Sequence, residues 1–137
     1  MEQSLYIKEV PQGLVEDIKS GKFKSYLELI DQIDVEYPNF DYSTDKWDET
    51  IKNLADGGNT FAQSYYALLQ INARNYKVAI QYATEAIKKN NADAYYFLCE
   101  CYFQGLGVEK DLEKCNELLN KAVELGSADA EYTEGLF

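Results

Sequence analysis

The side chains that could carry out chemistry in this 137-residue chain are limited in kind. The sequence contains no histidine, so proton transfer would fall to carboxylates, tyrosine, lysine or a cysteine of altered pKa. Carboxylates three or four residues apart occur, such as Glu113 and Glu117, but any solvent-exposed helix face produces that spacing. We therefore expect no catalytic residue and no enzymatic activity. A carboxylate-based enzyme ranks last among the functions considered.

Three cysteines complete the reactive set. Cys99 and Cys101 resemble half of a metal site, but residues two apart on a helix point about 200° away from each other and cannot easily hold one ion. We interpret them as structural thiols and expect neither a metal nor a cofactor. A disulfide between Cys99 and Cys115 stays open. The odd number of cysteines, together with the lack of an export signal at the N-terminus, favours a reducing compartment, so we expect a cytoplasmic protein.

The charge of the chain is strongly negative. Thirteen basic residues stand against 24 acidic ones, and residues 28–56 hold nine of the acids but only Lys46 and Lys52. Such a field repels nucleic acid and anionic membranes and attracts basic protein surfaces. No apolar run approaches the ~20 residues of a membrane span. We expect a basic protein or peptide as partner, although the acidity could also serve only to keep the protein in solution.

The elements that position these residues repeat along the chain. Asn91-Ala92-Asp93-Ala94 returns 36 residues later as Ser127-Ala128-Asp129-Ala130. Small residues that recur in register at a period in the thirties indicate stacked helical hairpins.

The clearest hairpin covers residues 92–126. Leu98, Cys99 and Tyr102 share one face of a helix that begins near Ala92, and the glycines of residues 105–107 end it. Asp111 then caps a second helix, whose buried stripe is Cys115, Leu118, Leu119 and Ala122.

The preceding hairpin covers residues 60–90, with Thr60 as the expected cap and Ala79, Ala83 and Ala86 facing inward. Residues 45–56 read as the second helix of a degenerate repeat that buries Trp47. Two helices are expected before it, at residues 11–19 and 22–36. The stripe expected on the second of these is Phe23, Tyr26, Leu27, Ile30 and Ile33.

The segment 94–126 resembles a Sel1-like repeat, a branch of the tetratricopeptide repeats with a longer hairpin loop that contains Gly-x-Gly. The residues that carry the resemblance are Ala94-x3-Leu98-Cys99-x2-Tyr102-x2-Gly105-x-Gly107-Val108-x2-Asp111-x2-Lys114-Cys115-x6-Ala122-x3-Gly126. Cysteines 99 and 115 replace the small glycine and alanine of the family. Two helices of a hairpin approach closely only where small residues sit at the crossing, so we expect Cys99 and Cys115 to be neighbours there. Residues 60–90, whose loop is four residues shorter, are more similar to a plain tetratricopeptide repeat.

We therefore predict one all-α domain over residues 1–137: a short right-handed α-solenoid of antiparallel helical hairpins, with about two and a half repeats. Its expected parts are an N-terminal helical extension (1–43), a degenerate half repeat (44–59), a tetratricopeptide-like repeat (60–91), a Sel1-like repeat (92–127) and a capping helix (128–137).

The resemblance implies a non-enzymatic adaptor or scaffold whose first helices line a concave groove for a protein or peptide. The repeat register assigns to that groove Phe61, Ser64, Leu68, Ile71, Asp93, Tyr96, Glu100, Phe103, Asp129 and Tyr132. This strip is acidic and aromatic, which suits lysine- or arginine-bearing ligands through charge pairs and cation–π contacts. Its apolar members indicate either partner contact or coverage by the N-terminal helix.

A second contact surface is expected in the loop of residues 37–43. Tyr37, Phe40 and Tyr42 lie there beside the acidic helix ends, and no helical periodicity explains them.

The alternative to an adaptor is an inhibitor that sequesters a basic enzyme, as immunity proteins do for toxins, and a DNA mimic is a third possibility. We expect a monomer, with a dimer through Leu136 and Phe137 as the other option.

Overall fold

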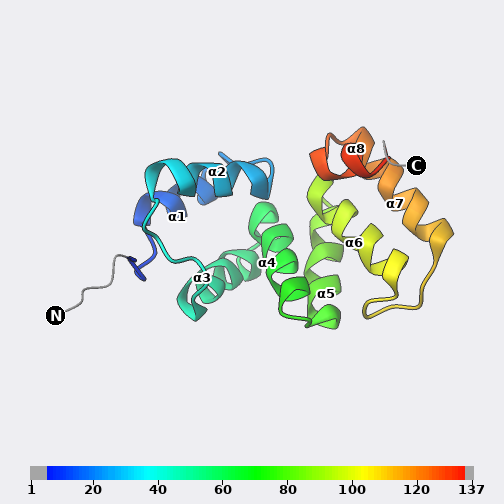
Figure 1. Ribbon diagram of the computed structural model, residues 1–137, viewed down its shortest axis with the longest axis horizontal. Helices are drawn as coiled ribbons and strands as arrows, with labels where there is room; N and C mark the ends of the chain where they lie inside the picture. The colour runs from blue at the N-terminus through cyan, green and yellow to red at the C-terminus, as the bar shows by residue number, and fades with distance from the viewer. Residues whose placement is uncertain (1–5, 135–137) are drawn as a thin grey trace.

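The computed structural model describes residues 6–134, which form eight helices (Figure 1). These are α1 (Gln12–Lys19), α2 (Tyr26–Glu36), α3 (Asp45–Asp56), α4 (Thr60–Asn72), α5 (Tyr76–Ile87), α6 (Ala92–Gln104), α7 (Leu112–Glu124) and α8 (Ala128–Glu134). Among the described residues, no helix is long and apolar enough to cross a bilayer. The proposed dimer contact at Leu136 and Phe137 lies outside the described residues.

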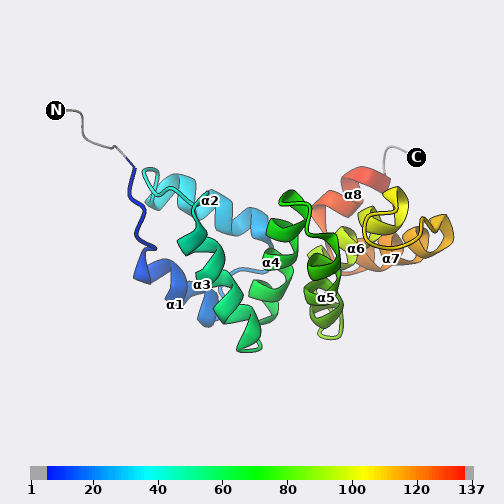
Figure 2. The same cartoon turned by 90° about the horizontal axis from the view of Figure 1, so that it is seen from below.

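The helices pack as sequential hairpins, so the expected all-α array is confirmed. Each helix from α3 to α8 packs on the next one, and α4, α6 and α8 also contact one another in turn. Figures 1 and 2 show α3 to α7 following one another along the long axis, with α2 and α8 on the same side of the row. Residues Ile7 and Phe40 add one isolated parallel β-bridge.

One capping arrangement begins the three helices α4, α6 and α8. Asn59, Asn91 and Ser127 each precede a helix, and each side-chain oxygen accepts a hydrogen bond from the backbone N–H three residues later. The donors are Ala62, Ala94 and Ala130, at 2.8, 2.9 and 3.1 Å, and all three alanines are fully buried. The expectation that Thr60 caps α4 was wrong by one residue, because Asn59 provides the acceptor.

Small side chains allow the two helices of a hairpin to approach closely. Cys99 of α6 and Cys115 of α7 lie with their Sγ atoms 3.0 Å apart, so the expected neighbours do meet. They belong to a core cluster that includes Ala83, Ala86 and Ala122. The distance between two helix axes is shorter where such small residues cross, so the two helices can pack closely.

The glycine-containing loop between α6 and α7 packs back on the preceding repeat. Gly105 and Gly107 have φ angles of 73° and 74°, which side-chain-bearing residues rarely adopt. A Cβ atom on Gly107 would lie 2.9 Å from the Cβ of Tyr76 at the start of α5. This glycine is therefore needed both for its backbone angle and for the close contact.

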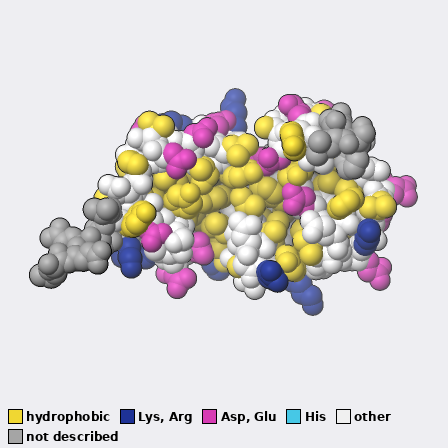
Figure 3. Space-filling model, in the orientation of Figure 1, with side chains coloured by type: hydrophobic (Ala, Val, Ile, Leu, Met, Phe, Trp, Pro, Cys, Tyr) yellow, Lys and Arg dark blue, Asp and Glu magenta, His cyan; other side chains and the backbone are white. Residues whose placement is uncertain are grey.

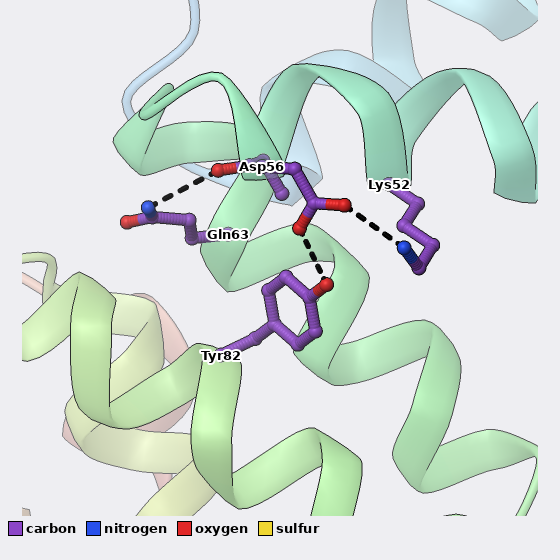
Figure 4. Close-up of polar contacts among 5 residues, drawn as sticks. Lys52, Asp56, Gln63 and Tyr82 are labelled. Carbon is purple, nitrogen blue, oxygen red and sulfur yellow. Dashed lines mark hydrogen bonds and ion pairs between the residues drawn. The ribbon is translucent and has the colours of Figure 1, made fainter.

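Polar contacts attach α3 to the hairpin that follows it (Figure 4). Asp56 accepts a 2.6 Å hydrogen bond from the Tyr82 hydroxyl of α5 and pairs with Lys52 at 2.9 Å. Two hydrogen bonds lower the pKa of Asp56. The larger contribution comes from the Lys52 ammonium and the smaller from the Tyr82 hydroxyl. Gln63 of α4 donates to the carbonyl of Ala55 at 3.2 Å. Three consecutive helices are thus joined around the end of α3.

The N-terminal extension shares the core of α3 and α4. Leu14, Ile18, Phe23, Leu29 and Ile33 are buried in one cluster with Trp47, whose side chain is fully buried as expected.

The helix expected from residue 22 begins four residues later, at Tyr26. Ser25 is the N-cap of α2, and Phe23 lies before the helix although it is buried. Leu27, expected on the buried stripe, is 37% exposed, and Leu29 is buried in its place.

Enlarging an alanine between the helices should destabilise the fold. We expect Ala122→Leu to lower the free energy of unfolding by about 1–3 kcal/mol, because three added carbons must displace packed neighbours. Thermal melting followed by circular dichroism measures this. Ala128→Leu, the same change at an exposed helix position, should leave the midpoint nearly unchanged. Equal midpoints for the two variants would contradict the packing described.

The Tyr82–Asp56 hydrogen bond should contribute to stability. Tyr82→Phe removes only the hydroxyl, so we expect a loss of about 0.5–1.5 kcal/mol in urea unfolding followed by the fluorescence of Trp47. Tyr95→Phe is the control, because no hydrogen bond involves the Tyr95 hydroxyl among the described residues. A loss of the same size in both variants would count against a specific role for the bond.

Candidate functional site

Two acidic residues of the expected groove bind the start of α2. Asp93 accepts hydrogen bonds from the Tyr26 backbone N–H at 3.0 Å and from the Ser25 hydroxyl at 3.3 Å. Asp129, one repeat later, accepts from the Tyr26 hydroxyl at 2.6 Å. The Tyr26 ring also packs against Phe97 of α6, with centroids 5.6 Å apart. The N-terminal extension therefore occupies these two positions of the groove.

Burial at this contact alters the ionisation of both partners. Asp93 is only 4% exposed, and burial raises its pKa, although the bonds from Tyr26 and Ser25 oppose the rise. Burial, followed by the hydrogen bond to Asp129, raises the pKa of the Tyr26 hydroxyl far above its usual range. Tyr26 therefore remains a donor to Asp129 at any physiological pH.

The extension also covers the α4 part of the expected groove. Phe61 is buried and packs on Phe23, with ring centroids 5.7 Å apart. Ser64 is buried, and Leu68 is half-buried against the same core cluster as the extension. Of the two explanations left open for these apolar positions, coverage by the N-terminal segment applies here. Ile71, further along α4, is half-buried.

The open part of the groove is a pocket between α6, α7 and α8. Its volume is about 280 Å³, and its lining residues are Tyr96, Cys99, Glu100, Phe103, Gln104, Cys115, Leu119 and Thr133. We call this the α6–α8 pocket. It brings together three of the residues expected in the groove, Tyr96, Glu100 and Phe103. Tyr132 is 72% exposed on α8 and is not part of the lining.

The polar groups of the α6–α8 pocket lie beside apolar walls. The Tyr96 hydroxyl lies 3.1 Å from the Thr133 hydroxyl. Burial raises the pKa of Tyr96 to about 12, and the neighbouring carboxylate of Glu100 contributes to the rise. Glu100 is half-buried and supplies a negative charge beside apolar walls formed by Phe103 and Leu119.

Cys99, which lines the pocket, and the nearby Cys101 of α6 are poor nucleophiles. Burial raises the pKa of Cys99 well above its usual range, and the hydrogen bond with Cys115 adds to the rise. Burial and the charge of Glu100 raise the pKa of Cys101 to about 11. Thiolate is the reactive and metal-binding form, so these thiols stay inert at neutral pH. Within residues 6–134, no group of three histidine, cysteine, aspartate or glutamate side chains could hold a metal ion.

Five lining residues of the pocket were not among the expected site residues. Cys99 and Cys115 were expected only at the crossing of two helices, and Leu119 only on the buried stripe of the second helix. Gln104 and Thr133 carried no signal. The signal that could have found the pocket is the pair of small residues at the crossing, because they leave space where larger side chains would fill it.

The expected aromatic loop is only partly at the surface. Phe40 is 4% exposed and packs edge-on against Trp47, with centroids 5.3 Å apart. Tyr37 is half-buried against the same core cluster, whereas Tyr42 is 37% exposed. Tyr42 is thus the member of the three that presents most of its surface.

The face of the molecule that carries α2 and α8 combines the two properties expected of the groove. Figure 3 shows hydrophobic side chains as a band between α2 and α8, with acidic side chains within it and around it. Such a surface offers both apolar contact and negative charge to a ligand.

The buried carboxyl of Asp93 should make stability depend on pH in an identifiable way. Because its pKa in the folded chain is raised above the ordinary 3.8, the folded chain holds this proton more tightly than the unfolded chain. The contribution of Asp93 to stability therefore falls as the pH rises from 3.8 through the raised pKa. Asp93→Asn removes this titration and keeps an oxygen acceptor.

We expect the stability of Asp93→Asn relative to the parent chain to increase between about pH 4 and pH 7. Urea unfolding across this range measures the difference. Asp56→Asn should show no such increase over this range, because the pKa of Asp56 is lowered in the fold and its stabilisation is lost only as the pH falls below 3.8. Parallel trends for the two variants would refute the assignment of Asp93.

Comparison with known families agrees with this architecture. The model of the Sel1 repeat matches residues 62–91 and 92–127. The first of these units is the one whose shorter loop had favoured a plain tetratricopeptide repeat. No curated protein matches the chain in sequence. Sel1 repeat proteins are generally protein-interaction modules and usually non-catalytic. Residues 62–127 therefore belong to the Sel1 repeat family, as two consecutive repeats.

Proposed function

We propose that this chain is a protein-interaction module that binds a basic segment of a partner protein in the α6–α8 pocket. The observation that carries the proposal is the pocket itself: an apolar cavity of about 280 Å³ with the Glu100 carboxylate in its lining. No lysine or arginine is among its lining residues. A lysine or arginine side chain has an apolar stem and a charged head, which matches this combination.

The charge of the whole chain favours the same class of partner. Its net charge is −11, and a field of this sign attracts basic surfaces and speeds their association. Phe103, 47% exposed at the pocket, offers a ring for cation–π contact. The other acidic groove residues, Asp93 and Asp129, already accept bonds from Tyr26. Glu100 is therefore the groove carboxylate that we assign to the ligand.

The inhibitor alternative has its own support in α2. This helix carries four acidic residues and no basic one, and Glu28, Asp31, Asp34 and Glu36 are all exposed. An exposed helix surface with four carboxylates and no basic residue suits the sequestration of a single basic enzyme. One tight, salt-sensitive complex with such an enzyme would favour the inhibitor over an adaptor with two partners. The three buried free thiols support a reducing, cytoplasmic setting for either role.

Selection from a display library of random ten-residue peptides tests the proposed ligand class. We expect the peptides retained by the full chain to be enriched in lysine and arginine. We expect Glu100→Gln to weaken their binding about tenfold in fluorescence anisotropy, because it removes the charge but keeps the shape of the side chain. The weakening should shrink as salt is raised.

Glu117→Gln is the matched control, since it removes the same charge from an exposed position of α7 that does not line the pocket. It should leave the affinity within twofold. Retained peptides without basic enrichment would overturn the proposal, as would equal effects of the two substitutions.

A further inference from the structure

A second hollow lies at the other end of the molecule, in the N-terminal extension. Its volume is about 440 Å³, and it is formed by the end of α2, the loop that follows and Tyr6. Tyr6, Phe40 and Tyr42 contribute aromatic rings, and Asp34 and Asp41 contribute carboxylates. We call it the Tyr42 hollow.

The walls of the Tyr42 hollow are held in place by the fold. The Ile7 N–H donates to the carbonyl of Asn39 at 2.6 Å, and the Asp41 N–H donates to the carbonyl of Ile7 at 2.8 Å. Phe40 is fixed against the buried Trp47, and its ring centroid lies 6.3 Å from that of Tyr42. The aromatic wall is thus attached to the core, which reduces the entropy cost of binding a ligand to it.

The two carboxylates of the hollow are negatively charged and differ in what they bind. Asp41 accepts from the backbone N–H of Ser43 at 3.1 Å and from its hydroxyl at 2.5 Å. These bonds lower the pKa of Asp41, and Lys8 nearby lowers it further. Asp34 is exposed and makes no hydrogen bond or ion pair with any described residue. No lysine or arginine is among the lining residues.

We propose that the Tyr42 hollow binds the guanidinium group of an arginine side chain from a partner protein. Arginine is preferred to lysine because its flat guanidinium stacks on aromatic rings and pairs with carboxylates through two parallel N–H donors. A bare metal ion fits less well, since aromatic rings line much of the hollow and offer it no ligand atoms. This site is separate from the α6–α8 pocket, and the inference does not depend on the function proposed for that pocket.

Titration of the ¹⁵N-labelled full chain with N-acetyl-L-arginine methylamide tests this inference by NMR. We expect a dissociation constant on the order of millimolar, as befits one side chain. Amide shifts should concentrate at residues 6–8, at Asp34 and at residues 40–43. N-acetyl-L-citrulline methylamide has nearly the same shape without the charge, so it should shift these amides much less.

Matched variants separate a specific site from general attraction to an acidic protein. Asp34→Asn should weaken arginine binding at least fivefold, because it removes the unpaired carboxylate. Asp31→Asn removes the same charge one turn earlier on α2, outside the lining, and should stay within twofold. Tyr42→Leu should also weaken binding at least fivefold if the ring stacks on the guanidinium. Unchanged spectra outside the loop would show that each variant is folded.

Several results would overturn the inference. The first is an equal chemical shift change with the citrulline probe, and the second is an equal effect of Asp34→Asn and Asp31→Asn on binding. The third is tighter binding of the corresponding lysine derivative than of the arginine probe. Binding of Ca²⁺ to the hollow at a lower concentration than the arginine probe would also overturn the inference, because it would indicate a cation site. Glu100→Gln should leave the shifts at residues 40–43 unchanged, so failure at one site is distinguishable from failure at the other.

Discussion

Close approach of paired helices is the constraint on which this structure depends. Two helices can lie with their backbones nearly in contact only where small side chains occupy the crossing, as Cys99 and Cys115 do between α6 and α7. The same small residues leave the floor of the α6–α8 pocket open. The packing rule that builds the hairpin therefore also creates the pocket.

The N-terminal extension decides how much of the repeat surface remains accessible. Ser25 and Tyr26 bind Asp93 and Asp129, which occupy equivalent positions in successive units. The donors at the start of α2 thereby supply hydrogen bonds to two carboxylates that would otherwise face a partner. The extension acts as a built-in occupant of half of the groove, and it leaves the Glu100 carboxylate of the α6–α8 pocket uncovered.

The two hollows present similar chemistry at opposite ends of the molecule. Both combine aromatic side chains with carboxylates, and neither is lined by a basic residue. Tyr42 and Phe103, each substantially exposed, supply the rings, while Asp34 and Glu100 supply the charge. A basic partner long enough to contact both would gain from the effective concentration that the first contact creates for the second.

The sequence alone determined the repeat, the helices and the crossing of Cys99 with Cys115, because these follow from local periodicity, capping residues and side-chain size. It also identified Tyr96, Glu100 and Phe103 as neighbours on one face. Only the tertiary structure decided that Phe61 and Asp93 are covered, that α2 begins at Tyr26, and that Phe40 is buried against Trp47. Those outcomes depend on which segment packs on a face, and such packing leaves no periodic trace in the chain; Asp93, for example, binds Tyr26, 67 positions away.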